Sequence, residues 1–305
     1  MQRSPLRIGT RGSPLALAQT KIVRELLAKA HAGLAFEVVP LKTTGERILD
    51  RTLADAGGKG LFTKEIDEAL LAGRVDLAVH SAKDVPTFLA PGLKLAAFPE
   101  REDPRDALIS EKANALASLP TGAVVGTSSI RREALVKRLR PDLSLKLMRG
   151  NVETRLQKVQ AGEFDAAILA LAGLRRLGLE SMATTALDPA TFPPSVGQGA
   201  IAIAIREDDA ETEKLVRAID HASTSIALAA ERAYLAALDG SCRAPIAGHA
   251  IIEGERLRLY GLVIAPDGSG AVETTREGSI RDAVALGRDA GEELRARAPA
   301  GVLDA

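Results

Sequence analysis

The chain has a single cysteine, Cys242, and the residues around it are typical of a loop. Gly240 and Ser241 precede it and Pro245 follows it, and these residue types favour turns over the interiors of helices or strands. One thiol can form neither an intramolecular disulfide nor a thiolate metal site. A loop thiol is accessible to covalent chemistry, although a lone cysteine is more often a small buried apolar residue.

Arginines gather at three predicted strand ends. One corner, residues 127–132, holds Thr127, Ser129, Arg131 and Arg132, and it precedes a predicted helix whose free N–H groups favour anions. Guanidinium groups suit carboxylates because they donate two parallel hydrogen bonds. On its own, this corner would more often be a helix N-cap with solvated arginines.

Two further corners carry the same residue types. The second holds Arg11 and Ser13, and the third holds Arg149, Asn151 and Arg155. Strand ends in open α/β sheets face the crevice where ligands bind. The three corners together therefore predict a cleft for a ligand with several carboxylates. A polyphosphate would also suit the arginines, but the sequence contains no evident acidic pair to hold its metal.

A fourth polar corner, residues 80–86, follows a predicted buried strand and contains Lys83 and Asp84. A carboxylate there could stabilise a developing cation or transfer a proton. The alternative is that Asp84 simply forms the turn before Val85 and Pro86, which is common for aspartate.

Two glycine-rich motifs resemble nucleotide-binding sequences. Residues 197–202 fit the dinucleotide pattern G-x-G-x-x-[GA], but prolines precede them and a strand follows, so we reject that function. Residues 57–60 surround Lys59 but lack the Walker spacing. We interpret them as part of a lid with one cation.

Helix and strand patterns alternate along the first two thirds of the chain, which predicts α/β domains with largely parallel sheets. Strands are expected at residues 6–10, 36–41, 75–79, 123–127, 144–148 and 200–205, and helices at 14–26, 61–72, 129–140, 211–220 and 224–237. Residues 123–127 repeat 6–10 in kind, and 162–168 repeat 73–79 in the same order. By this repeat, Ala172 and Gly173 correspond to Lys83 and Asp84.

The predicted fold is therefore two similar α/β lobes joined by a hinge, followed by a small α+β domain. The expected boundaries are residues 1–99 with 200–219 for the first lobe, 100–199 for the second, and 220–305 for the third domain, which carries Cys242. The segment 200–205 is expected to return to the first lobe, because two crossing segments would make a hinge.

Length and composition are those of a globular protein of two or three domains. The chain has 305 residues, 46% of them hydrophobic, and 40 basic residues balance 40 acidic ones. This balance gives no indication of a nucleic-acid or membrane partner, and no apolar run could span a bilayer. The N-terminus shows no signal-peptide core, so a cytoplasmic protein is expected. The four histidines are scattered, so no metal is expected.

Many of these residues resemble the motifs of the porphobilinogen deaminase, or hydroxymethylbilane synthase, family. The stretch 231–245 is similar to that family's cofactor-attachment signature, with departures at Tyr234 and Ala244. Seven further motifs match in the family's order: Thr10-Arg11-x-Ser13-x-Leu15-Ala16, Gly57-Gly58-Lys59-Gly60-Leu61-Phe62, His80-Ser81-x-Lys83-Asp84-Val85-Pro86, Gly126-Thr127-Ser128-Ser129-x-Arg131-Arg132, Arg149-Gly150-Asn151, Leu169-Ala170-x-Ala172-Gly173-Leu174 and Val196-Gly197-Gln198-Gly199.

The resemblance implies a role for each matching residue. Asp84 would be the catalytic acid/base, and Cys242 would hold a dipyrromethane cofactor through a thioether bond. The other cofactor-binding residues would be Ser81, Lys83, Thr127, Ser129, Arg131, Arg132, Asn151 and Gly173. The substrate-binding residues would be Arg11, Ser13, Lys59, Arg149, Arg155 and Arg176. Some members have a second lysine where this chain has Asp55, so Lys59 would be the only lid cation.

The resemblance also implies a reaction. The protein would be a transferase that joins four porphobilinogen molecules head to tail with loss of ammonia. It would act as a monomer and release hydroxymethylbilane for the biosynthesis of haem and other tetrapyrroles. The alternative is a two-lobed receptor or sensor module that binds carboxylates without catalysis, since the lobes and the arginines fit both functions.

Overall fold

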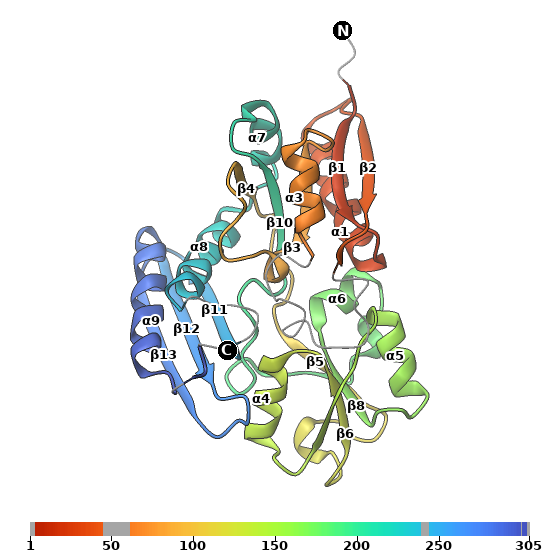
Figure 1. Cartoon of the computed structure of the whole chain (residues 1–305), viewed down its shortest axis with the longest axis vertical. Helices are drawn as coiled ribbons and strands as arrows, with labels where there is room; N and C mark the ends of the chain where they lie inside the picture. The colour runs from red at the N-terminus through yellow and green to blue at the C-terminus, as the bar shows by residue number, and fades with distance from the viewer. Residues whose placement is uncertain (1–3, 45–61, 239–243, 300, 304–305) are drawn as a thin grey trace.

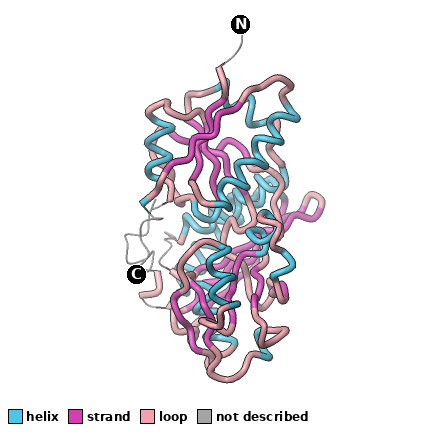
Figure 2. The backbone as a smooth tube through the Cα atoms, turned by 90° about the vertical axis from the view of Figure 1, so that its right-hand side faces the viewer, coloured by secondary structure: helices cyan, strands magenta, loops and turns pink. Residues whose placement is uncertain are grey.

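The computed structural model describes residues 4–44, 62–238, 244–299 and 301–303. Three sheets organise these residues, one in each of two lobes and one in a smaller domain beside them (Figure 1). The two lobes are stacked along the long axis of the molecule (Figure 2).

The first lobe is built on a five-stranded sheet in the order β2-β1-β3-β10-β4. Strands β1, β2 and β3 are parallel, and β10 is antiparallel to both of its neighbours. Its elements are β1 (Leu6–Arg11), α1 (Pro14–Ala30), β2 (Phe36–Leu41), α3 (Lys64–Leu71), β3 (Leu77–Ser81), the 3-10 turn η1 (Ala82–Asp84), β4 (Leu93–Ala97), β10 (Ile201–Arg206) and α7 (Ala210–Arg217).

Alternation along β3 assigns the helices to the two faces of this sheet. Leu77 and Val79 pack in one cluster with residues of α1 and α7, whereas Ala78 packs in another with residues of α3. Successive side chains of a strand point to opposite faces, so α1 and α7 cover one face and α3 covers the other. Helix α1 starts as the sequence predicts, with Pro14 in its first turn and Ser13 accepting a hydrogen bond from the Ala16 N–H.

The second lobe repeats this topology. Its five-stranded sheet has the order β7-β6-β8-β5-β9, in which β6, β7 and β8 are parallel and β5 is antiparallel to β8 and β9. Its elements are β5 (Asp106–Ile109), η2 (Leu116–Ser118), β6 (Val124–Thr127), α4 (Ile130–Leu139), β7 (Ser144–Leu147), α5 (Val152–Gln160), β8 (Ala166–Ala170), α6 (Leu171–Arg176), η3 (Glu180–Met182) and β9 (Thr185–Ala186). The predicted repeat of two similar lobes is confirmed.

Two segments of chain connect the lobes, and we call them together the hinge. Residues 98–105 lead from β4 to β5, and residues 187–200 lead from β9 back to β10. Each crossing ends in the antiparallel strand of the sheet that it enters. The sheets are therefore mixed, and the prediction of largely parallel sheets is wrong. The sequence pattern does not reveal the direction of the strands that follow the two crossings.

The third domain is a three-stranded antiparallel sheet packed against two helices. Its elements are α8 (Ala222–Ala237), β11 (Ile246–Glu253), β12 (Arg256–Ile264), β13 (Ala271–Ser279), η4 (Ile280–Asp282) and α9 (Ala283–Arg297). A small α+β domain was expected here, and its three strands lie between Ile246 and Ser279. We propose that the domain boundaries predicted from the sequence hold, since each of the three parts contains one sheet.

Tyr234, one of the two departures from the family signature, fits the core of this domain. It lies fully buried on α8, and its hydroxyl is 3.1 Å from the Ala247 carbonyl oxygen and 3.2 Å from that of Leu262. A Cβ atom at Gly248 or Gly261 would lie 2.8 Å from the ring. Two glycines therefore make room for the tyrosine, and two carbonyl groups provide acceptors for its hydroxyl.

Candidate functional site

Lys83 and Asp84 lie in η1, the turn that directly follows β3. The Ala82 N–H donates to the Ala200 carbonyl oxygen at 3.0 Å, which fixes this turn to the hinge. Ser81 pairs with Ile201 in the first sheet, and Ala170 pairs with Asp106 at the equivalent place in the second. Positions 83 and 84 are therefore equivalent to 172 and 173, as the repeat predicted, and one lobe presents charge where the other presents small residues.

Arg131 and Arg132 lie in the first turn of α4 and are almost fully buried, at 3% and 6% exposure. Both bind Asp106, which is 0% exposed: Nη2 of Arg131 lies 2.7 Å from Oδ2, and Nη2 of Arg132 lies 2.7 Å from Oδ1. The alternative of two solvated arginines is therefore wrong. Sequence reasoning missed Asp106, and no local signal identifies it, because its partners lie 25 and 26 residues away.

The electrostatics of this triad favour the ionised form of Asp106. Burial alone would raise the pKa of Asp106, but the guanidinium groups of Arg131 and Arg132 outweigh it and hold that pKa well below its usual range. Burial lowers the pKa of Arg131, and Asp106 opposes this effect. Asp106 therefore fixes both arginines in place through its two ion pairs.

Removing one member of this triad should be costly. Asp106→Leu leaves two guanidinium groups buried without their carboxylate, so we expect a loss of about 3–5 kcal/mol in the free energy of unfolding. Chemical denaturation would measure it. The control is Asp142→Asn, which removes a carboxylate from an exposed ion pair with Arg140 in the same lobe. Equal stability of the Asp106 variant and the control would contradict a structural role for the triad.

Lys83 of the first lobe faces the cations of the second lobe. Burial lowers the pKa of Lys83 to about 8, and Arg132 and Arg131 lower it while Asp84 and Asp106 oppose them. Its ammonium group lies 3.2 Å from Oε1 of Gln198, a hinge residue that sequence reasoning did not assign to the site.

Arg155 of α5 joins the same cluster. Its guanidinium group donates to the Gly150 carbonyl oxygen at 2.9 Å and to the Ser128 hydroxyl at 3.1 Å. Burial lowers its pKa to about 10, with further lowering by Arg132 and Arg149 and an opposing effect of Asp84. The Asp84 carboxylate therefore lies close enough to interact with cations from both lobes.

Other predicted site residues form hydrogen bonds at the starts of α4 and α5. The side chain of Ser129 accepts from the Arg132 N–H, and that of Asn151 accepts from the Thr154 N–H. The Thr127 hydroxyl accepts from the Ser129 N–H at 3.1 Å. These three residues rigidify the turns that position Arg132 and Arg155.

Four other predicted site residues contact the first lobe or the hinge. The Arg11 guanidinium stacks over the Phe62 ring at 4.2 Å, and the Ser81 hydroxyl pairs with the Gln19 side chain. Arg176 donates to the Gly199 carbonyl oxygen in the hinge at 2.6 Å. A Cβ atom at Gly173 would lie 3.6 Å from Leu15 of the first lobe, so this glycine lies where the lobes approach each other. Cys242 and Lys59 lie outside the described residues.

A buried carboxylate ties α8 to both hinge segments. Glu231 of α8 forms an ion pair with Arg101 in one crossing and accepts from the Gly197 N–H in the other at 2.7 Å. It also accepts from the Ala250 N–H of β11 at 2.8 Å. One side chain therefore joins the third domain to the hinge rather than to either lobe alone.

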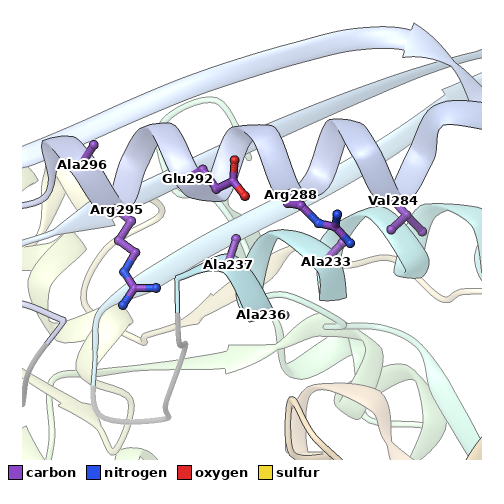
Figure 3. Close-up of a pocket in the computed structure, with 8 residues that line it drawn as sticks. All are labelled: Ala233, Ala236, Ala237, Val284, Arg288, Glu292, Arg295 and Ala296. Carbon is purple, nitrogen blue, oxygen red and sulfur yellow. The ribbon is translucent and has the colours of Figure 1, made fainter.

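A groove of about 620 Å³ lies away from this cluster, between α8 and α9 (Figure 3). Three alanines of α8 line one side, and Arg288, Glu292 and Arg295 line the other. None of its lining residues is one of the site residues predicted from the sequence. Among the residues that the structure describes, there is no cluster that could hold a metal ion and no helix long and apolar enough to cross a membrane.

Two family models together match most of the chain. Residues 6–214 match the family model described as "Porphobilinogen deaminase, dipyromethane cofactor binding domain", and residues 225–296 match the one described as its C-terminal domain. The chain belongs to the porphobilinogen deaminase family. The sequence resemblance is thereby confirmed.

Individual porphobilinogen deaminases are close in sequence. The chain is 58% identical over 293 residues to the porphobilinogen deaminases of Nitrobacter hamburgensis and Nitrobacter winogradskyi, covering 95% of this chain and 93% of each relative. Among solved structures, it is similar to a periplasmic substrate-binding protein of an ABC transporter from Coxiella burnetii. That similarity has a TM-score of 0.44 and 18% identity, over 70% of this chain and 91% of the other.

The cluster between the lobes fits the dipyrromethane cofactor of porphobilinogen deaminases, whose acetate and propionate groups are anionic. Cations outnumber carboxylates in the cluster, where Lys83, Arg131, Arg132 and Arg155 face Asp84 and Asp106. Within the described residues, the buried Nε atom of Arg131 has no hydrogen-bond partner. A buried site with excess positive charge and an unused donor favours an anionic ligand.

Proposed function

We propose that this protein joins four porphobilinogen molecules head to tail and releases hydroxymethylbilane, as a hydroxymethylbilane synthase. Porphobilinogen is its substrate, and a dipyrromethane attached to Cys242 is its cofactor. The observation that carries the proposal is the position of Asp84 among cations from both lobes, in a chain that matches porphobilinogen deaminases over nearly its whole length. We also propose that it works as a monomer in the cytoplasm.

In this proposal the cationic residues bind and the carboxylate acts. When bound, the dipyrromethane supplies the pyrrole carbon to which the first substrate is joined. Lys83, Arg132 and Arg155 would hold acetate and propionate groups through charge-assisted hydrogen bonds. At each step a C–N bond of the substrate breaks, ammonia leaves, and a C–C bond forms with loss of a proton from the attacking pyrrole.

Asp84 would stabilise the positive charge that develops on the pyrrole nitrogen when ammonia leaves. A carboxylate oxygen of Asp84 would also accept the proton that is lost after coupling. Because Asp84 is half-buried, its charge is less screened there than it would be in water.

The test is turnover by the purified protein, combined with its intact mass. We expect release of ammonia and a linear tetrapyrrole from porphobilinogen, and a mass that exceeds the sequence mass by one dipyrromethane. A receptor or sensor module would bind carboxylates but weigh no more than its sequence and release no ammonia. That result would overturn the proposal.

Arg149 should act on substrate rather than on cofactor assembly. It is half-buried, and Arg149→Leu is expected to lower kcat/KM for porphobilinogen by roughly 10- to 100-fold, because one charge-assisted hydrogen bond is lost.

Arg131→Leu and Arg132→Leu should instead reduce the fraction of protein that carries cofactor, measured by intact mass. Arg288→Leu in the groove of the third domain is the control. Wild-type kinetics and full loading in all three site variants would argue against a carboxylate-binding cleft.

A further inference from the structure

The backbone around Gln198 is held from several directions. Gly197 and Gly199 both have positive φ, at 73° and 87°, a conformation that glycine adopts without strain. A Cβ atom at Gly197 would lie 3.0 Å from the Lys83 backbone nitrogen, and one at Gly199 would lie 2.3 Å from the Glu102 carbonyl oxygen. The two glycines therefore allow the hinge segment 187–200 to pass between the backbone of the Lys83 turn and the backbone of the other hinge segment, 98–105.

Side chains then fix this segment. The Gln198 carbonyl oxygen accepts from Nε of Arg101 at 2.8 Å, and the neighbouring Gly197 and Gly199 are bound by Glu231 and Arg176. With its backbone held on both sides, the Gln198 side chain has a defined direction. It is 1% exposed.

The Gln198 amide spans the two lobes. Its Nε2 group donates to the Pro104 carbonyl oxygen at 2.7 Å and to Oδ1 of Asp106 at 2.8 Å. Its Oε1 atom accepts from Nζ of Lys83 at 3.2 Å and from Nη2 of Arg132 at 3.4 Å. Acceptors lie on one side of the amide and donors on the other, so a flipped amide would oppose like groups and only this orientation satisfies the network.

We infer that Gln198 is a positioning residue that keeps the Lys83–Asp84 turn of the first lobe aligned with the Asp106–Arg132 pair of the second. This inference rests on the proposed function, because alignment matters where Asp84 and the cations act on one substrate. Lys83 and Asp84 are adjacent in η1, so a bond to the Lys83 side chain also restrains the turn that holds the carboxylate. Misplacement of about 1 Å in such a site can cost two orders of magnitude in rate.

Glutamate, methionine and asparagine each fail to provide both halves of this bridge. A glutamate would face the Asp106 carboxylate and lose the donor, and a methionine would fill the space without either hydrogen bond. An asparagine keeps the amide but is one methylene too short to reach from the fixed hinge backbone to both lobes. These three substitutions therefore separate the contributions of polarity, reach and the acceptor oxygen.

The experiment compares the holoenzyme with Gln198→Met, Gln198→Asn and Gln198→Glu, with Gln160→Met as the control. Gln160 is exposed at the end of α5. Each protein is assayed for kcat and KM from acid to alkaline pH, for cofactor loading by intact mass, and for thermal melting. The pH profile is the readout that a general loss of stability would not move.

The expected shift follows from the groups that face Lys83. Arg131 and Arg132 from α4 disfavour its charge, while Asp84 from η1 and Asp106 from β5 favour it. The Gln198 oxygen also favours the ammonium form by accepting its proton. Losing that oxygen should lower the pKa of Lys83, so the alkaline limb of kcat/KM should move to lower pH by roughly half a unit or more in Gln198→Met and Gln198→Asn.

We expect kcat to fall about tenfold or more in the methionine and asparagine variants, because at least one hydrogen bond to a charged group is lost. In Gln198→Glu, which keeps an acceptor for Lys83, the alkaline limb should stay at or above its wild-type pH. The inference would be overturned if the folded methionine and asparagine variants kept the alkaline limb of kcat/KM and the kcat of the wild type. An equal shift of that limb to lower pH in all three variants would overturn it too. If the methionine variant does not fold, the asparagine variant decides. An inactive wild-type protein would instead refute the proposed function.

Discussion

Asp84→Asn is expected to lower the turnover of porphobilinogen by about 10²- to 10⁴-fold, which is the range for loss of a positioned acid/base group. The variant should remain folded. The amide keeps the size and shape of the carboxylate but removes its charge. It can neither stabilise a cationic pyrrole nor accept the proton lost on coupling. Steady-state release of ammonia would measure the effect, and thermal melting would establish that the variant is folded.

Two companion variants make this result specific. Asp84→Glu keeps the charge but displaces it by one methylene, so it should retain partial activity. Asp208→Asn is the control, because Asp208 is an exposed aspartate of the same lobe. A folded Asp84→Asn protein that turns over within a few-fold of wild type would exclude this carboxylate from the chemistry.

Cys242→Ala is expected to abolish both the mass excess and the turnover. Cys242 is the only cysteine in the chain, so no other thiol can replace it as the attachment point. The denatured wild-type protein should therefore show no free thiol once it carries the cofactor. Intact mass and thiol titration of the same sample would measure loading in two independent ways.

The control for this variant is its thermal melting, which distinguishes a protein that cannot load the cofactor from one that cannot fold. A cofactor-free thiol in a fully active wild-type protein would show that Cys242 is not the attachment point. Retention of the mass excess by Cys242→Ala would show that another residue holds the group.

The sequence predicted the parts of this molecule that depend on local pattern. Strand–turn–helix repeats identified both lobes, and the alignment of Lys83 and Asp84 with Ala172 and Gly173 is the one that the sheets show. What it could not predict was how the charges pair. Asp106 stands at the end of a run of charged residues that is typical of a loop. Its structural role arises only when folding brings it into ion pairs with Arg131 and Arg132.

Gln198 was missed for a similar reason. Its motif matches the family and does not fit a dinucleotide site, but a glutamine between two glycines carries no sequence signal for bridging two lobes. The glycines themselves are explained by backbone that approaches within 3.0 Å, which is a tertiary property. Positions whose function lies in joining distant segments are therefore the ones that pattern reasoning leaves unassigned.

The link from Glu231 to both crossings has a mechanical consequence. When two bodies turn about a common axis, points on the axis travel least and points at the far ends of the lever arms travel most. Glu231 fastens α8 beside that axis, and the chain runs from the end of α8 toward Cys242. Opening or closing of the lobes would therefore displace the part of α8 around Glu231 little, while the edges of the two lobes far from the hinge would travel most.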